Sequence, residues 1–320
     1  MTDAPSAKPT VAFVGTGVMG SSMAGHLMDA GYPLVVFNRT KGRADALVAR
    51  GAAWAESPGE AAAAADVVIS IVGYPADVEE VYLAPGGVVE RAREGALLVD
   101  MTTSSPALAA RISAAAEATG RGLSAIDAPV SGGDAGAKNA TLTIMVGGEA
   151  AAFERAEPIL RVMGANVVLQ GGPGAGQHTK MANQVAIAGS MLATVESLAY
   201  ARATGLDPRT VLESIGAGSA ASWSLANLAP RIQDGNFGPG FYVKHFVKDL
   251  RIALAEAEAA GIDLPGCALA KRLYELLEAK GGGELGTQAL WLLYADDAAR
   301  QRASVDASAT TRAATARPAE

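Results

Sequence analysis

Lys180 is the residue of this sequence best suited to move a proton. It stands near the start of a predicted helix, residues 177–203, that carries almost no charge, and Asn183 and Gln184 follow it on the same face. An ammonium group is costly to bury, and burial beside a positive group lowers its pKa towards the range useful for proton transfer. The pattern predicts a general acid or, more commonly for a lone lysine, a side chain that extends to solvent.

A second group of residues could bind a carboxylate. The stretch Asp127-Ala128-Pro129-Val130-Ser131-Gly132-Gly133 follows a predicted strand. The hydroxyl of Ser131 and the backbone N–H groups of Gly132 and Gly133 are donors that an anion could use. An ordinary turn built from proline and glycine has the same composition and stays the alternative.

A glycine-rich turn near the start predicts a dinucleotide site. Gly15, Gly17 and Gly20 have the spacing G-x-G-x-x-G between an apolar strand, residues 11–14, and a helical segment, residues 21–30. The first glycine makes the turn, the second admits the pyrophosphate and the third lets the helix pack on the strand. Val18 and Met19 then lie at the helix N-terminus that faces the phosphates. This context favours a bound dinucleotide over a turn without a ligand.

The end of the next predicted strand indicates which dinucleotide. It reads Asn38-Arg39-Thr40, where an NAD-binding protein usually places an acidic residue on the ribose hydroxyls. Arg39 can pair with a 2′-phosphate, while Asn38 and Thr40 donate hydrogen bonds. We therefore expect NADP(H) to be preferred, with NAD(H) possible; a solvated surface arginine is the alternative.

The remaining elements predict two domains. Predicted strands at 34–37, 66–72, 96–100, 123–127 and 141–146 alternate with helical segments at 43–49, 58–65, 106–118 and 151–163. This alternation is typical of an α/β Rossmann-type domain with a doubly wound, mostly parallel sheet. The later segments, 208–215, 222–232, 241–260, 266–280 and 285–296, are all helical. We predict an NADP-binding domain at 9–170, an all-α domain at 171–298, and disordered tails at 1–8 and 301–320.

Composition excludes several classes of function. The 320 residues carry a net charge of −7 with scattered basic residues, which argues against nucleic acid, and no apolar stretch is long enough for a membrane span. A single cysteine, Cys267, favours a cytoplasmic protein, and no spacing of histidine, cysteine and carboxylate residues predicts a metal site. The helix at 177–203 is apolar on nearly every side, so we expect it to run between the domains or into a subunit interface, the latter in a homodimer or homotetramer.

Five stretches, in this order, resemble the β-hydroxyacid dehydrogenase family, which includes 3-hydroxyisobutyrate dehydrogenase, tartronate semialdehyde reductase and the glyoxylate/succinic semialdehyde reductases. The resemblance runs from Val11 to about Tyr294. The matching stretches are Val14 to Gly20, Asp127 to Gly133 with Gly136-Ala137, Thr141 to Gly148, Gly174-Ala175-Gly176 with Lys180, and Lys248-Asp249-Leu250.

The resemblance implies a reaction and a role for each site residue. Hydride would pass between the nicotinamide of NADP(H) and a small β-hydroxy acid or semialdehyde carboxylic acid, with Lys180 as general acid or base. Ser131, Gly132 and Gly133 would hold the substrate carboxylate, and Asn183 or Gln184 would orient both the substrate and Lys180. The cofactor would be contacted by Val72, Thr103 and Lys248, and Asp249 would support the site.

Departures from the family pattern keep substrate choice open. Gln184 stands where the family often has asparagine, Asn139-Ala140 stands where it commonly reads glycine, and residues 286–290 lack its usual acidic residue and serine. An imine reductase is the alternative enzyme, although those proteins usually replace the lysine. A sugar-phosphate dehydrogenase of the 6-phosphogluconate type fits less well. A non-catalytic NADP-binding module would keep Arg39 without needing Lys180, and Lys248-Asp249 could be an exposed pair.

Overall fold

The computed structural model describes residues 8–295, which form two compact units. The first runs to Asn183 and the second begins at Gln184. The sequence predicted a boundary near residue 171, whereas the units divide inside helix α9 (Ala175–Ala203), because the start of α9 is hydrogen-bonded to loops of the first unit. Apart from Lys8, the predicted tails lie outside the described residues.

The first unit contains a nine-stranded, mostly parallel sheet, as the sequence predicted. The order is β3-β2-β1-β4-β5-β6-β8-β7, and β9 pairs with β8. Strand β8 runs antiparallel to β6 and β7 and parallel to β9. The strands are β1 Val11–Val14, β2 Leu34–Phe37, β3 Ala53–Trp54, β4 Val67–Ser70, β5 Leu97–Asp100, β6 Ser124–Asp127, β7 Val130–Ser131, β8 Leu142–Gly147 and β9 Gly164–Gly171.

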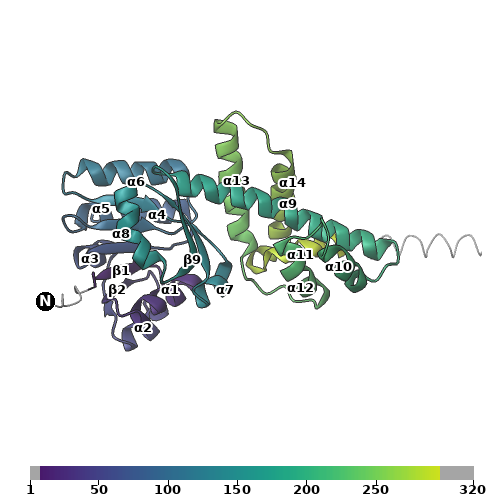
Figure 1. Cartoon of the computed structure of the whole chain (residues 1–320), viewed down its shortest axis with the longest axis horizontal. Helices are drawn as coiled ribbons and strands as arrows, with labels where there is room; N and C mark the ends of the chain where they lie inside the picture. The colour runs from purple at the N-terminus through teal and green to yellow at the C-terminus, as the bar shows by residue number, and fades with distance from the viewer. Residues whose placement is uncertain (1–7, 296–320) are drawn as a thin grey trace, which may run out of the picture. The chain divides into compact units, whose positions relative to one another are not determined.

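Helices cover both faces of this sheet (Figure 1). One face packs on α1 (Val18–Asp29), α2 (Asp45–Ala49), α7 (Gly133–Lys138) and α8 (Ala150–Leu160). The other packs on α3 (Pro58–Ala63), α4 (Pro75–Leu83), α5 (Val88–Arg91) and α6 (Pro106–Ala118). Alternate side chains of β1, β2, β4, β5 and β6 enter the two cores, as for Phe13 on one face and Val14 on the other. The sheet is therefore fixed from both sides, and its strand ends are held in place.

Several elements of the first unit were not predicted from the sequence. They are the short strands β3 and β7, the helices α4, α5 and α7, and the eight-residue strand β9. Strand β9 lies on the outer side of β8, and six of its residues are exposed or only partly buried. It lacks the continuous apolar run that marks the buried strands of a parallel sheet.

The second unit is entirely helical apart from an isolated bridge between Tyr242 and Gly286, which agrees with the sequence prediction. Helices α10 (Pro208–Gly216), α13 (Val243–Ala259) and α14 (Pro265–Ala279) surround the later part of α9, with Phe246 and Tyr274 fully buried between them. The segment 222–232, predicted as one helix, is two helices, α11 (Trp223–Asn227) and α12 (Ala229–Gln233). Pro230 at the start of α12 cannot donate the N–H that a continuous helix needs.

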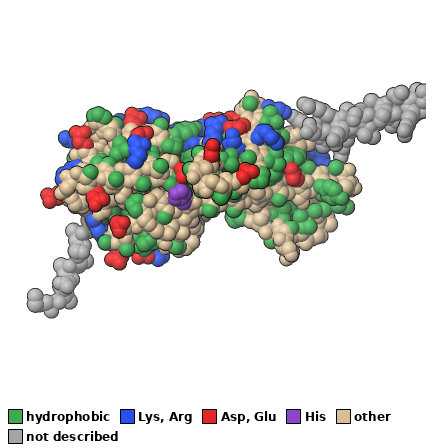
Figure 2. All heavy atoms as spheres, turned by 90° about the horizontal axis from the view of Figure 1, so that it is seen from above, with side chains coloured by type: hydrophobic (Ala, Val, Ile, Leu, Met, Phe, Trp, Pro, Cys, Tyr) green, Lys and Arg blue, Asp and Glu red, His purple; other side chains and the backbone are tan. Residues whose placement is uncertain are grey.

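Within this single chain, one face of helix α9 is buried and another is exposed. One face is buried in the core of the second unit, including Met191, Val195 and Leu198. On another face of α9, a stripe of small residues is exposed in this single chain: Ala186, Gly189 and Ala193. On the face that Figure 2 shows, hydrophobic side chains gather over part of the helical unit, whereas acidic and basic side chains are interspersed over the first. Within residues 8–295 no helix has the length and apolar content of a membrane span.

Candidate active site

The three glycines of the turn between β1 and α1 differ in what requires them: two are required by packing, and the third leaves space for a ligand. A Cβ atom on Gly15, whose φ is 99°, would lie 2.1 Å from the carbonyl oxygen of Ile71, and one on Gly20 would lie 1.9 Å from that of Gly15. A Cβ on Gly17 would meet no atom within 4 Å. The fold itself therefore requires glycine at 15 and 20, but nothing in the protein requires it at 17. The space beside Gly17 fits a group that approaches the backbone closely, as a pyrophosphate does.

The start of α1 supplies donors to that space. Gly17 is the N-cap residue of α1 and has no side chain to occupy the first N–H groups of the helix. Val18 is 56% exposed, which is high for a valine of the first helical turn. Backbone donors at a helix N-terminus form an anion site. The residues of this turn thus fit the phosphates of a dinucleotide.

The end of β2 presents one arginine to solvent. The side-chain oxygen of Asn38 accepts a hydrogen bond from the N–H of Thr16 at 3.0 Å, and its amide donates to the carbonyl of Thr40 at 2.9 Å. Asn38 therefore ties the glycine turn to the strand end. The side chain of Arg39 is 85% exposed and forms an ion pair with Asp77 at 3.2 Å. A guanidinium in this position can turn to a phosphate at little cost.

Polar side chains end three neighbouring strands at one edge of the sheet. Ser70, Asp100 and Asp127 are the last residues of β4, β5 and β6, and they are paired directly across the sheet. Ser70 donates to Asp100 at 2.8 Å, and its hydroxyl lies 2.8 Å from that of Tyr82. Burial raises the pKa of Asp100 to about 6, against the opposing effect of hydrogen bonds from Thr102 and Ser70. This edge is where a doubly wound sheet binds its ligands.

The loops that follow β4 and β5 are joined at this edge. The N–H of Val72 donates to the hydroxyl of Thr102 at 2.9 Å, and the N–H of Thr102 donates to Asp100 at 3.1 Å. The predicted cofactor residues Val72 and Thr103 are both partly exposed beside these bonds. The hydrogen bond between Val72 and Thr102 thus joins the two loops that carry the predicted cofactor residues Val72 and Thr103.

The predicted carboxylate-binding turn is formed at the start of α7. Ser131 ends β7 and pairs with Thr143 of β8. Gly132 and Gly133 have φ angles of 128° and 61°, backbone conformations that favour glycine. The turn therefore directs backbone N–H groups in a way that most other residues at these positions would resist.

The start of α9 holds Lys180 in the first unit. Lys180 is only 5% exposed, so the prediction of a lysine that extends to solvent is wrong. Asp127 accepts hydrogen bonds from the N–H groups of Gly174 and Gln177, both at 2.7 Å. Burial raises the pKa of Asp127, while these backbone hydrogen bonds oppose the rise. Asn183 lies one turn after Lys180 on the same helix and is partly buried.

The second unit holds Gln184, Lys248 and Asp249. The side-chain amide of Gln184 donates to Asp249 at 2.6 Å, and the ammonium of Lys248 lies 3.0 Å from the other oxygen of that carboxylate. The side chains of Lys248 and Asp249 are 12% and 1% exposed, so the alternative of an exposed surface pair is wrong. Burial lowers the pKa of the neighbouring His245, and the charges of Lys248 and Lys244 lower it further.

Comparison with known proteins covers almost all of the described chain. Residues 10–172 match the family model of the NAD-binding domain of 6-phosphogluconate dehydrogenase, and residues 174–294 match that of the NAD-binding domain of NADP-dependent 3-hydroxyisobutyrate dehydrogenase. An uncharacterized oxidoreductase of Bacillus subtilis is 54% identical over 287 residues, which are 90% of this chain and 99% of that protein. A probable mitochondrial 3-hydroxyisobutyrate dehydrogenase-like protein of Arabidopsis thaliana is 50% identical over 88% of this chain and 84% of its own.

The solved structure of Mycobacterium tuberculosis 3-hydroxyisobutyrate dehydrogenase with L-serine superposes with a TM-score of 0.82. It is 31% identical and covers 89% of this chain and 99% of its own. The chain belongs to the β-hydroxyacid dehydrogenase family. The family resemblance inferred from the five sequence stretches is therefore confirmed, as is the two-part fold. A nicotinamide dinucleotide is the cofactor of these oxidoreductases, and the glycine turn of this family member fits it.

One departure of this β-hydroxyacid dehydrogenase from the family pattern has a physical consequence. Ala140, in the place where the family commonly reads glycine, has a φ of 54°. This left-handed conformation costs a residue with a Cβ roughly 1–2 kcal/mol. The loop between α7 and β8 is therefore strained next to the turn formed by Ser131, Gly132 and Gly133.

Sequence reasoning assigned no role to Ser70, Asp100, Asp127 or Gln177. Each is buried and forms a hydrogen bond at the carboxyl edge of the sheet or at the start of α9. A signal for three of them was present, because each ends a buried apolar strand with a polar residue. Gln177 gave no comparable local signal.

Proposed function

We propose that this protein is an NADP(H)-dependent oxidoreductase that moves a hydride between nicotinamide and a small β-hydroxy acid or semialdehyde carboxylic acid. The observation that carries the proposal is the buried Lys180 at the start of α9, in the unit that also holds the glycine turn and the Ser131–Gly133 segment. A buried lysine of this kind is a ready proton donor or acceptor, because desolvation disfavours its charged form.

The carboxylate would be held by Ser131, Gly132 and Gly133. Their hydroxyl and N–H groups are donors with no need for a charged side chain, and the positive φ angles of both glycines orient them. The mycobacterial relative was solved with L-serine, a small hydroxy acid with one carboxylate. A substrate of that size and charge class suits the donors of this chain.

The nicotinamide supplies or accepts the hydride when the cofactor is bound. Lys180 would donate a proton to the carbonyl oxygen during reduction and take it from the hydroxyl during oxidation. Asn183 would orient the substrate beside Lys180, and Gln184, held by Asp249, would assist it. Val72, Thr103 and Lys248 would contact the cofactor. Positioning and one proton transfer are then the whole contribution of the protein.

The preference for NADP(H) would rest on Arg39. Its guanidinium is exposed at the end of β2 and is held only by a surface ion pair with Asp77. Arg39→Ala is expected to weaken NADPH binding about 10- to 100-fold and NADH binding little, because a charge-assisted contact to phosphate contributes roughly 1.5–3 kcal/mol. Dissociation constants of both cofactors, measured by fluorescence titration, test this directly.

The activity itself is tested by following NADPH and NADH oxidation with glyoxylate, succinic semialdehyde, tartronate semialdehyde and methylmalonate semialdehyde. Turnover with NADPH that falls about 10²- to 10⁴-fold in Lys180→Ala supports the proposal. Tight NADPH binding without turnover on any of these acids would favour the binding module or, if cyclic imines are reduced, an imine reductase. Full activity in Lys180→Ala would remove Lys180 as the proton donor.

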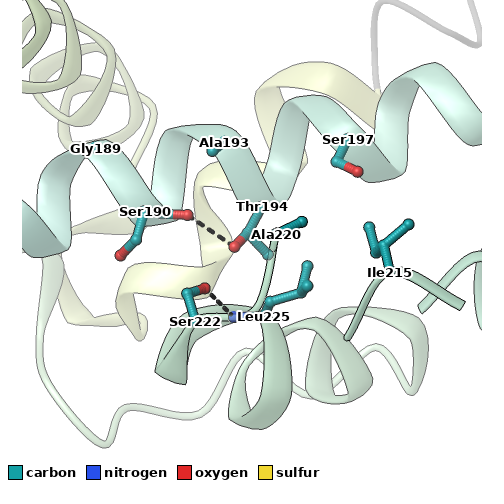
Figure 3. Close-up of a pocket in the computed structure, with 9 residues that line it drawn as sticks. All are labelled: Gly189, Ser190, Ala193, Thr194, Ser197, Ile215, Ala220, Ser222 and Leu225. Carbon is teal, nitrogen blue, oxygen red and sulfur yellow. Dashed lines mark hydrogen bonds between the residues drawn. The ribbon is translucent and has the colours of Figure 1, made fainter. Parts of the chain in front are cut away.

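We also propose that the protein self-associates through the exposed side of α9. Beside the small residues of that stripe lies a hollow of about 410 Å³ in the second unit, lined by α9 and the segment from Ile215 to Leu225 (Figure 3). Tyr200, Leu206 and Trp223 are 70%, 53% and 69% exposed in this unit. Large exposed apolar side chains near a hollow are typical of subunit interfaces. Light scattering after size exclusion is expected to give a dimer or tetramer, and Ala193→Glu a smaller species.

A further inference from the structure

Two buried side chains at the start of α9 have no part in the chemistry described so far. Asp127, the last residue of β6, is 3% exposed, and Gln177, in the first turn of α9, is fully buried. A buried carboxylate and a buried amide are costly unless they are hydrogen-bonded. What they bond to shows what they do.

The carboxylate of Asp127 closes the N-terminus of α9. Each of its oxygens accepts a backbone hydrogen bond of 2.7 Å, one from Gly174 and one from Gln177. The negative charge therefore stands at the positive end of a 29-residue helix, where a carboxylate is most stabilising.

Two glycines make room for this carboxylate. A Cβ on Gly147 would lie 2.5 Å from one oxygen of Asp127, and a Cβ on Gly176 would lie 2.8 Å from the other. The carboxylate thus occupies a slot that only glycine leaves open. A longer side chain such as glutamate has no space in it.

Gln177 joins the same helix start to the loop after β5. Its side-chain oxygen accepts from the N–H of Ser104 at 2.9 Å, and its side-chain amide donates to the carbonyl of Thr102 at 2.7 Å. These two backbone groups lie on either side of Thr103, the residue proposed to contact the cofactor. One helical turn after Gln177 comes Lys180.

We propose that Asp127 and Gln177 are positioning residues that fix Lys180 and Thr103 to one another as a single rigid body. Asp127 sets where α9 begins, and Gln177 holds the loop 102–104 against it. The distance from the proton donor to the cofactor loop is then set by four hydrogen bonds within the first unit. This inference rests on the proposed function, because it gives Lys180 and Thr103 the roles proposed above.

The test compares Gln177→Met, which removes both side-chain hydrogen bonds at similar volume, with Gln177→Glu, which keeps the acceptor for Ser104 and, in its protonated form, a donor for Thr102. Placing reacting groups about 1 Å away from their productive positions costs up to about 100-fold in rate. We expect kcat to fall about 10- to 100-fold in Gln177→Met and less in Gln177→Glu, with KM for the acid changed less than 3-fold. An equal fall of kcat in the two variants, or a change in KM with kcat unchanged, would overturn the proposal.

A matched control is Arg121→Met. Like Gln177, Arg121 hydrogen-bonds two backbone groups of the first unit, here the carbonyls of Val89 and Ala92, but it precedes β6 and so lies at the opposite edge of the sheet. It is expected to lower the melting temperature much as Gln177→Met does while leaving kcat within 2-fold. If both variants lose rate in proportion to stability, Gln177 has a structural role only.

A measurement on the cofactor-free protein separates this inference from the proposed function. Amide hydrogen exchange is expected to quicken at least 10-fold at Ser104 in Gln177→Met and at residue 177 in Asp127→Asn, and Ser104 is expected to recover protection in Gln177→Glu. If the wild-type protein reduces none of the acids and this pattern still appears, the proposed function fails while the coupling of α9 to the loop stands. Unchanged exchange at Ser104 would contradict the coupling itself.

Discussion

The two units hold their buried carboxylates in different ways. In the first unit, Asp127 is held by backbone N–H groups, and Asp100 by a backbone N–H and a hydroxyl at the sheet edge. In the second unit, Asp249 contacts the side chains of Gln184 and Lys248. Backbone donors are fixed by the sheet and helix, whereas long side chains must lose rotamer freedom to keep their place. The first unit is therefore preorganised, and the second depends on the pairing of particular side chains.

The largest effect on stability is expected from Asp249→Ala. Lys248 is nearly buried, and removing one partner of a buried ion pair costs about 3–5 kcal/mol because the other charge stays desolvated. Urea unfolding followed by circular dichroism measures this loss. The double variant Lys248→Met, Asp249→Ala is expected to recover much of it. A loss below about 1 kcal/mol in the single variant would show that this ion pair contributes no more to stability than an exposed surface pair.

A smaller and pH-dependent effect is expected from Asp100. Its pKa is raised from 3.8 to about 6 by burial, so the folded protein keeps the proton that the unfolded chain releases near pH 4. The stabilisation is complete below about pH 4 and is lost as the pH rises through 6, by at most about 3 kcal/mol.

Asp100→Asn provides the reference for this prediction, because its neutral amide keeps an oxygen for Ser70 and Thr102. The free energy of unfolding of the wild type is expected to fall relative to this variant between pH 4 and 6 and to stay level above about pH 7. A difference that does not change with pH would mean that Asp100 is ionised throughout.

A gain of at most about 1.5 kcal/mol is expected from Ala140→Gly. Glycine removes a left-handed strain of roughly 1–2 kcal/mol but makes the unfolded chain more flexible by about 0.4–1 kcal/mol. Thermal unfolding of the two proteins measures the balance. A destabilised variant would show that the alanine side chain contributes packing that outweighs the strain.

The smallest effect on stability is expected from Gly17→Ala, although it concerns the cofactor directly. A Cβ there meets no protein atom within 4 Å, so stability should change by less than about 0.5 kcal/mol, while NADPH affinity falls at least 10-fold. Gly20→Ala is the matched control, because its Cβ would lie 1.9 Å from a carbonyl oxygen. It is expected to destabilise the first unit before any ligand is added. Unchanged NADPH binding in Gly17→Ala would place the pyrophosphate elsewhere.

The sequence predicted local features well and distant pairings poorly. The glycine turn, the six predicted strands and the helical second unit follow from spacing and apolar runs, and the structure confirms them. The bonds of Gln177 reach residues 73 and 75 positions away, and Gln184 reaches a residue 65 positions away. No local pattern encodes such partners, because they depend on how strands and helices distant in sequence are arranged in the fold. Composition also does not say which face of α9 packs within the chain and which stays exposed there.

The buried Cys267 has a practical consequence. It is the only cysteine of the sequence, it is 4% exposed, and burial raises the pKa of its thiol. A protonated, covered thiol reacts slowly with alkylating reagents. A cysteine introduced at any exposed position would therefore be the single reactive thiol of the molecule. Fluorophores or spin labels attached there could then report motion in either unit, and Cys267 would not have to be replaced first.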